Sequence, residues 1–476
     1  MKKKTNIYAI LLCSLLMSSA LGCGKAATAD VTSTASDAIA TEASNDNTTD
    51  KTSANDVMND TSSTENTTED VSRDESSSSD SSDEVTEKTD TETDKTLEDE
   101  DNQEKEKDST QAKAPVSDDA ILKDLSKNFF TFGVGINGST LENQTLNIPE
   151  YMELCKKHFN SCTMTNLMKS CYILDQMGSQ ENLKNGNEEP ALSFYSIDPT
   201  LEWCKENGMK MRGHTLVWHT QAPEWFFREG YTEDGDYVSK ETMLLRMESY
   251  IRQLMTHVQE AYPGVVYCWD VVNEAVDPDS AEPDSDFMCR TKLESADNPW
   301  YATIGSDYVE MAFTYARKYA ADDVKLFYND YNTYQAPKTD AIYKLCESLK
   351  EKDLIDGIGM QGYWGISYPS NSDIESAIKK FAELGLEIHI TELSVGVDAE
   401  TDDQFEKQAD KYGQLFKMLC ELDTDNGGPA NITNVTVFGL VDHYREGDTT
   451  NSRLFDKDYN PKPAYAKIVE ALEEFN

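Results

Sequence analysis

Two glutamates near the ends of two strand-like stretches are the side chains best suited to chemistry in this sequence. Glu274 closes the run Trp269–Ala275, and Glu392 lies in the run Glu387–Leu393. An apolar, β-branched run that ends in polar groups is typical of a buried parallel strand emerging at its C-terminal end. Two carboxylates facing each other across a barrel mouth are what cleavage of a glycosidic bond requires. The alternative is that each glutamate only caps a helix or pairs with a lysine, but two in matching contexts favour the chemical interpretation.

The elements that must position these glutamates alternate regularly from residue 129 onward. Strict alternation of strand and helix indicates a parallel sheet, and eight such units favour a closed (β/α)₈ TIM barrel. An open doubly wound sheet is the alternative, but no Gly-rich phosphate loop follows the first strand. The predicted strands are 129–137, 161–166, 209–218, 265–275, 325–332, 357–364, 387–395 and 432–440, and the predicted helices are 149–159, 197–207, 241–260, 307–320, 338–352, 373–384, 403–421 and 464–475.

Polar and aromatic side chains gather at the ends of seven of the eight predicted strands. In this fold chemistry occurs at the C-terminal face of the strands, so the pattern predicts a long polar cleft there. Trp and Tyr at such positions suit the faces of sugars, although Trp218 and Trp364 could instead be core residues. These strand-end residues are Asn166, Lys169, His214, Trp218, His219, Gln221, Asn273, Glu274, Asn329, Asp330, Gln361, Tyr363, Glu392, Asp442 and His443.

The N-terminal part of the chain differs in composition from the rest. Residues 1–23 combine Lys2–Lys4 with an apolar run through Leu21, which is typical of a signal peptide. Small residues precede Cys23, so we expect a lipoprotein processing site, with ordinary secretion as the alternative. Residues 24–115 are rich in Ser, Thr, Asp and Glu and predict a disordered acidic linker before a catalytic domain at 116–476. Such a linker reaches on the order of 50 Å, which suits an extracellular enzyme anchored to the outer face of a bacterial membrane.

Charge and cysteine usage narrow the possible partners. The formal net charge is −45, and residues 1–115 carry 26 acidic and 11 basic side chains, so the folded part is also strongly acidic. Nucleic acid is therefore excluded as a partner, and a neutral polysaccharide fits best, although acidity can also serve solubility alone. The ten cysteines show no CxxC and no Cys/His metal spacing, so we expect no metal and no organic cofactor. Most of the cysteines should be buried thiols. Disulfides are permitted, but the sequence assigns no pairing. We expect the protein to be a monomer.

Several longer stretches together resemble glycoside hydrolase family 10, whose members are mostly endo-β-1,4-xylanases. The resemblance covers nearly all of 125–475 in the family's order, and as a combined signal it is strong. The stretches that carry it are Gly213–His219, Trp269–Ala275, Asn298–Trp300, Phe327–Tyr331, Gly357–Gly362, Ile390–Leu393, Leu454–Asp456 and Tyr459–Tyr465.

The resemblance implies a role for each candidate residue. Glu274 would be the acid/base and Glu392 the nucleophile of a hydrolase that retains configuration, which requires carboxyl groups about 5–5.5 Å apart. One carboxyl must be protonated while the other stays ionised. Asn273 would donate to the sugar 2-hydroxyl, and His219 would lie beside the acid/base. The remaining substrate-binding residues would be Asn166, Lys169, His214, Trp218, Gln221, Gln361, Tyr363 and Phe438.

The sequence also departs from the family at four positions around the sugar. Thr165 replaces a glutamate that contacts sugars, and Tyr363 replaces a histidine near the nucleophile. Phe438 and Glu446 replace two tryptophans that cover the sugar at the cleavage point. We therefore expect a more open cleft and a xylan or another, decorated β-glycan as substrate. A surface glycan-binding protein without activity is the rival hypothesis, and the intact pair of glutamates argues against it.

Overall fold

The computed structural model describes residues 120–281, 287–294, 296–445 and 447–476. The predicted signal peptide, the acidic linker, Cys23 and Glu446 lie outside the described residues. No helix within the described ranges is long and apolar enough to cross a membrane.

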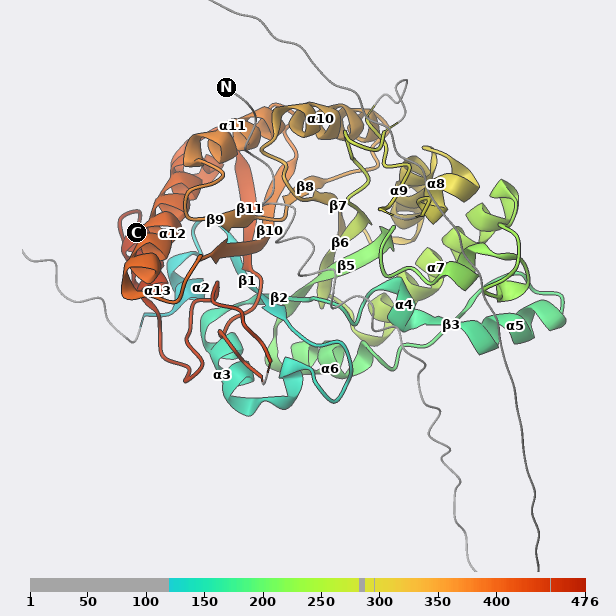
Figure 1. Cartoon of the computed structure of the whole chain (residues 1–476), viewed down its shortest axis with the longest axis horizontal. Coiled ribbons are helices and arrows are strands. Elements are labelled where there is room, and N and C mark those ends of the chain that lie inside the picture. Colours follow the sequence, from blue (N-terminus) through green and yellow to red (C-terminus); the bar gives the residue numbers. More distant parts are fainter. Residues whose placement is uncertain (1–119, 282–286, 295, 446) are drawn as a thin grey trace, which may run out of the picture. The chain divides into compact units, whose positions relative to one another are not determined.

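Eight parallel strands form a closed barrel, as predicted (Figure 1). Neighbouring strands pair in chain order, and the last strand pairs with both the strand before it and the first one, which closes the ring. Closure confirms the (β/α)₈ fold and rules out an open doubly wound sheet. The barrel strands are β1 (Thr131–Ile136), β2 (Ser161–Met164), β5 (Lys210–Trp218), β6 (Val266–Asn273), β7 (Lys325–Asp330), β8 (Gly357–Met360), β10 (Glu387–Gly396) and β11 (Asn431–Val437).

A helix follows each barrel strand or precedes the next one, and these helices surround the strands in Figure 1. Each buries an apolar face against the barrel, and their ends carry expected signals. Gly208 ends one helix in the left-handed region at φ 65°, and Ser370 begins another with a capping box. The helices are α3 (Pro149–His158), α6 (Asp198–Asn207), α7 (Lys240–Ala261), α9 (Tyr308–Tyr319), α10 (Ala336–Glu351), α11 (Asn371–Ala382), α12 (Asp402–Leu422) and α13 (Pro463–Glu473).

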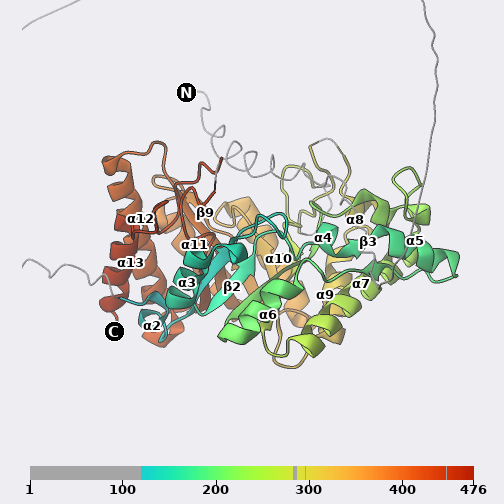
Figure 2. The ribbon, with the colours of Figure 1, turned by 90° about the horizontal axis from the view of Figure 1, so that it is seen from below.

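The segment between β2 and α6 contains structure for which the sequence pattern made no prediction. It comprises α4 (Ser170–Ile173), β3 (Leu174–Asp175), α5 (Gln176–Lys184) and β4 (Ala191–Leu192), with β3 and β4 paired antiparallel. Figure 2 shows these elements grouped at the α7 side of the barrel. Arg246 and Arg252 of α7 form ion pairs with Glu188 and Glu189 of this segment. The elements are too short for a periodic pattern, and the contacts with α7 stabilise them.

One predicted strand is divided in the structure. The stretch 357–364 is predicted to be one strand, but β8 ends at Met360. A separate strand, β9 (Tyr363–Gly365), pairs with β10 farther along that strand. The cause is Gly362, whose φ of 90° is accessible to glycine and breaks the extended conformation. Gln361 consequently turns toward the barrel mouth, and its backbone N–H donates to the carbonyl of Asp330 at 3.0 Å.

The cysteines behave mainly as small apolar side chains. All eight described cysteines are buried except Cys171, which is half-buried, and no disulfide joins two of them. The Sγ atoms of Cys162 and Cys204 approach to 3.4 Å in the core. The prediction that most are buried thiols is confirmed for the part of the chain that the structure describes.

Candidate active site

Glu274 follows β6 directly and has an unusual backbone. Its φ is 58°, a left-handed value that costs a non-glycine residue about 1 kcal/mol or more. The N–H of Glu274 donates to the carbonyl of Asn329 at 2.9 Å, and its carbonyl accepts from Arg290 Nε at 3.0 Å. The carboxylate accepts from Gln361 Nε2 at 2.8 Å on one oxygen and from Trp218 Nε1 at 2.9 Å on the other. Two hydrogen bonds therefore hold the backbone of Glu274, and two more orient its carboxylate.

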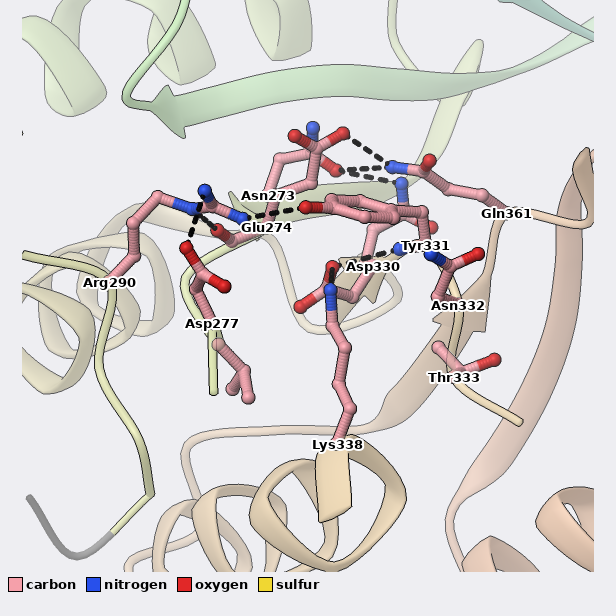
Figure 3. Close-up of polar contacts among 12 residues, drawn as sticks. Asn273, Glu274, Asp277, Arg290, Asp330, Tyr331, Asn332, Thr333, Lys338 and Gln361 are labelled. Atoms are coloured by element: carbon pink, nitrogen blue, oxygen red, sulfur yellow. Dashed lines mark hydrogen bonds and ion pairs between the residues drawn. The ribbon is translucent and has the colours of Figure 1, made fainter. Parts of the chain in front are cut away.

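A charged network supports Glu274 from below (Figure 3). Arg290 forms an ion pair with Asp277 at 2.9 Å and donates to the Tyr331 hydroxyl at 2.9 Å. Lys338 of α10 lies 3.6 Å from the centre of the Tyr331 ring and forms an ion pair of 2.7 Å with Asp330. Burial raises the pKa of Asp330, and the charge of Lys338 opposes this rise. The network connects the strained backbone of Glu274 to the end of β7.

Glu392 lies inside β10, where the register of pairing with β11 shifts. Its backbone N–H donates to the carbonyl of Gln361 at 2.6 Å. Oε1 accepts from Asn329 Nδ2 at 3.0 Å, and Oε2 accepts from the Tyr363 hydroxyl at 2.5 Å. Burial raises the pKa of Glu392, and the charge of Glu274 adds to the rise, whereas His214 and the two donors lower it. The carboxylate is thus buried but held by groups that favour its ionised form.

Asn329 connects the surroundings of the two glutamates. Its Oδ1 accepts from Thr391 Oγ1 at 2.7 Å, so its amide nitrogen faces Asn273 Oδ1 at 2.8 Å as well as Glu392. Since Asn273 Oδ1 is the acceptor in this contact, the Asn273 amide nitrogen is left to donate to a ligand. The sequence predicts Asn329 as one of the polar strand-end residues but not as one of the substrate-binding residues. The sequence signals for it are its position at the end of β7 and its place in the stretch Phe327–Tyr331, which belongs to the family resemblance.

Lys169, Gln221, Asn166 and Trp218 form one wall of the site. Lys169 Nζ donates to Gln221 Oε1 at 2.8 Å and lies 4.5 Å from the centre of the Trp218 ring. Gln221 Nε2 is 3.4 Å from Asn166 Oδ1. Burial lowers the pKa of Lys169 to about 8, although the charges of Glu392 and Glu274 oppose this effect. An ammonium group near both carboxylates can stabilise negative charge at the point where a sugar would lie.

The two predicted histidines have different environments. His214 Nδ1 lies 2.9 Å from Asp270 Oδ2, and the buried Asp270 also binds Arg212 through two hydrogen bonds of 3.0 and 2.6 Å. His219 Nε2 lies 4.0 Å from Glu274 Oε2. Burial, with a contribution from the charge of Arg290, lowers the pKa of His219 well below its ordinary value, so this ring is neutral beside Glu274. His214 is therefore tied to a charged pair, whereas His219 is an uncharged neighbour.

The aromatic residues divide into core and site residues. Trp364 is 3% exposed and belongs to the core, so the alternative interpretation is correct for it. Trp218 instead reaches Glu274, and its backbone carbonyl accepts from Trp300 Nε1 at 3.0 Å. Phe438 packs edge-to-face against Tyr363 with ring centres 5.9 Å apart. Tyr363 thus lies between Phe438 and Glu392, and its hydroxyl donates to Glu392.

All twelve candidate residues therefore belong to one connected group at the C-terminal ends of the barrel strands. The group contains two carboxylates with different partners, several amide donors and one buried ammonium group. No set of three or more His, Cys, Asp and Glu residues in the described ranges could hold a metal ion. The arrangement can supply a proton donor, a nucleophile and donors to sugar hydroxyls.

Comparison with known proteins agrees with this geometry. The model of glycosyl hydrolase family 10 matches residues 121–471. A Caldicellulosiruptor saccharolyticus protein assigned as an endo-1,4-beta-xylanase is 47% identical over 315 residues, which are 64% of this chain and 96% of the relative. Endo-1,4-beta-xylanase B of Butyrivibrio fibrisolvens is 38% identical over 70% of this chain, which spans only 51% of that relative.

A solved structure of a family 10 xylanase is also similar to this chain. The CBM22-1–GH10 modules of Clostridium thermocellum endo-1,4-beta-D-xylanase 10B, complexed with xylohexaose, superpose with a TM-score of 0.67 at 33% identity. The match covers 74% of this chain and 67% of the other. Because the family model spans the whole barrel and a relative of similar domain length is 47% identical, this chain belongs to glycosyl hydrolase family 10.

Proposed function

We propose that this protein is a retaining endo-1,4-β-xylanase that acts outside the cell. The observation that carries the proposal is the pairing of Glu274 and Glu392, which share a site but have different hydrogen-bond partners. The relatives named as xylanases, and the neighbour complexed with xylohexaose, support xylan as the substrate class.

In this mechanism Glu392 is the nucleophile. Its ionised form is favoured by the Tyr363 hydroxyl, the Asn329 amide and the charge of His214, which oppose the effect of burial. Attack on the anomeric carbon forms a glycosyl-enzyme intermediate. The Asn273 amide donates to the 2-hydroxyl of the same sugar, an interaction that strengthens in the transition state.

Glu274 is the acid/base of the same reaction. It gives its proton to the leaving glycosidic oxygen and then takes a proton from the water that hydrolyses the intermediate, so the two displacements retain configuration. Trp218 and Gln361 orient its carboxyl group, and the neutral His219 adds no competing positive charge next to it.

Substitution of each glutamate tests the assignment. Glu392→Ala should abolish turnover of xylan and of aryl xylobiosides. Glu274→Ala should cripple hydrolysis of xylan but spare formation of the intermediate from a substrate whose leaving group needs no proton. Initial rates on both substrates, with circular dichroism to verify folding, give the comparison. If Glu392→Ala kept more than about one per cent of the wild-type rate, the nucleophile would be misassigned. Binding of xylan by the wild-type protein without any hydrolysis would support the glycan-binding alternative.

The sugar-covering positions favour a second, narrower proposal within the same class. The ring of Phe438 is smaller than that of tryptophan. It is buried and packs against Tyr363, so little of its face is available to a sugar. We expect plain xylose units to bind less tightly and branched chains to be tolerated better. Comparison of kcat/KM for linear and branched xylo-oligosaccharides in the wild type and in Phe438→Trp tests this. An unchanged preference in Phe438→Trp would contradict it.

The predicted signal peptide (residues 1–23) and the acidic linker (residues 24–115) support a further proposal, that the enzyme is anchored to a membrane. Cys23 follows small residues and precedes an acidic segment, which suits a lipid anchor and a tether. Cys23→Ala should move the protein from the membrane fraction to the medium, and removal of residues 1–115 should leave activity on soluble xylan intact. Wild-type protein found wholly in the medium would contradict the anchor.

A further inference from the structure

Arg453 is a cation at the site for which the proposed reaction has no use. Its Nη1 donates to Ser394 Oγ at 3.3 Å, and its guanidinium forms no ion pair with any carboxylate of the described residues. The side chain is half-buried, and Nε and Nη2 have no acceptor within the same part of the chain. In a protein with a net charge of −45, an arginine near the paired glutamates that forms no ion pair within the described residues is unexpected.

The surroundings of Arg453 hold it in place. Its backbone N–H donates to Asp442 Oδ1 at 2.8 Å, while the other oxygen of Asp442 binds Lys462 Nζ at 2.5 Å. A Cβ atom at Gly439, whose φ is 107°, would lie 2.6 Å from the Arg453 Cζ, so the guanidinium occupies space that only glycine leaves open. Lys462 is the ion-pair partner of Asp442, and Arg453 adds only a lesser charge interaction with it, so Nε and Nη2 of Arg453 are available to a ligand.

The position of Arg453 places it beside the sugar that Glu392 would attack. Ser394 is two residues after Glu392 in β10, and the positive charge of Arg453 opposes the rise in the pKa of Tyr363 that burial causes. Ser394 is also the register partner of Tyr363, whose hydroxyl binds Glu392. Gly439 directly follows Phe438, which packs on Tyr363. The guanidinium therefore lies near Tyr363 and Glu392, where the proposed mechanism holds the part of the substrate that stays on the enzyme.

We propose that Arg453 binds the carboxylate of a uronic acid branch on the xylan chain, on the sugar units held on the Glu392 side. The proposal rests on the proposed xylanase function and specifies its substrate. A guanidinium with two free donor groups matches a carboxylate in geometry and in charge. The overall negative charge does not prevent this, because charges beyond about 8 Å are largely screened at physiological ionic strength.

The test compares three substrates of equal backbone length. These are a linear xylo-oligosaccharide, the same chain with one glucuronic acid branch, and the branched chain after reduction of its carboxyl group to an alcohol. The wild type should have a kcat/KM about tenfold higher for the acidic branch than for the reduced branch, as expected for hydrogen bonds to a charged group. Arg453→Gln should bring this ratio close to one. The ratio is measured within one variant, so a general loss of activity cancels.

Arg445→Gln is the matched control, because Arg445 is an exposed arginine of the same loop that packs over Tyr444. It should keep the wild-type ratio. Hydrolysis in ¹⁸O-labelled water, followed by mass spectrometry, should place the branch on the labelled fragment, which is the part held by Glu392.

Each outcome decides between the hypotheses. A wild-type ratio near one, an unchanged ratio in Arg453→Gln, or a branch on the unlabelled fragment would overturn the Arg453 proposal alone. Absence of hydrolysis of all three chains by the wild type would overturn the xylanase function itself, and the Arg453 proposal with it.

Discussion

The hydroxyl of Tyr363 can be removed with little other change to the site. Its oxygen lies 2.5 Å from Glu392 Oε2, whereas its ring packs edge-to-face on Phe438. Tyr363→Phe deletes the donor and keeps the ring contact. The variant therefore isolates one of the groups that favour the ionised form of Glu392.

The direction of the effect follows from the forces on Glu392. Burial raises the pKa of this carboxyl, and the Tyr363 hydroxyl is one of the groups that lower it. Loss of the donor removes a lowering effect, so the pKa rises further. A hydrogen bond to a charged group is worth about 1.5–3 kcal/mol, and about 1.36 kcal/mol corresponds to one pKa unit. We expect an upward shift of about one to two pH units.

The assay is the pH dependence of kcat/KM on an aryl xylobioside with an activated leaving group. Such a substrate needs no proton donor, so the acid limb reports the ionisation of the nucleophile in the free enzyme. Attack requires the ionised form, and activity is lost as the pH falls through the pKa of Glu392. The acid limb of Tyr363→Phe should therefore lie at higher pH than that of the wild type, with the plateau rate affected less.

Tyr368→Phe is the control, because Tyr368 is an exposed tyrosine of the following loop, 55% exposed and without a contact to Glu392. Its acid limb should match that of the wild type. Circular dichroism at each pH separates titration from unfolding. A limb that stays in place in Tyr363→Phe, or moves to lower pH, would refute the reasoning that this hydroxyl stabilises the ionised nucleophile.

Three further predictions concern Arg290, Asp270 and the nucleophile Glu392. Arg290→Ala should lower kcat about tenfold or more with little change in KM, because the carbonyl of the strained Glu274 loses its hydrogen-bond donor. Arg252→Ala, which breaks an ion pair far from the site, should leave kcat unchanged. Steady-state kinetics on xylan would contradict the prediction if both variants behaved alike. Asp270→Asn should lower the free energy of unfolding by about 3–5 kcal/mol, because Arg212 is left buried without a counter-charge. A decrease of less than about 1 kcal/mol in urea denaturation would be inconsistent with this expectation. Burial raises the pKa of Glu392, so its ionised form opposes folding at neutral pH. This cost falls as the pH drops through the raised pKa and is gone below the ordinary pKa of a glutamate. Glu392→Gln should therefore raise Tm by about 1–3 °C at pH 7, and calorimetry should show no gain in acid below that ordinary value.

The barrel and the central glutamates could be predicted from the sequence because their signals are local. Each barrel strand is a short apolar run, and each helix carries its own periodicity and end signals, so alternation alone indicates the fold. Glu274 and Glu392 lie within short runs whose residue types define a strand end. Lys169 and Gln361 are predicted as strand-end residues, and their substrate-binding role comes from the family resemblance.

The tertiary structure decided which side chains act on these glutamates, because contacts between distant residues depend on strand register and on backbone turns. Gly362 breaks the predicted strand and thereby turns Gln361 toward Glu274. Asn329 is 63 residues from Glu392, and only the pairing of neighbouring strands brings its amide to both Asn273 and Glu392. Arg453 is 59 residues from Ser394 and reaches it because Gly439 leaves space for the guanidinium. No local pattern encodes such distances, since they arise only when the barrel closes.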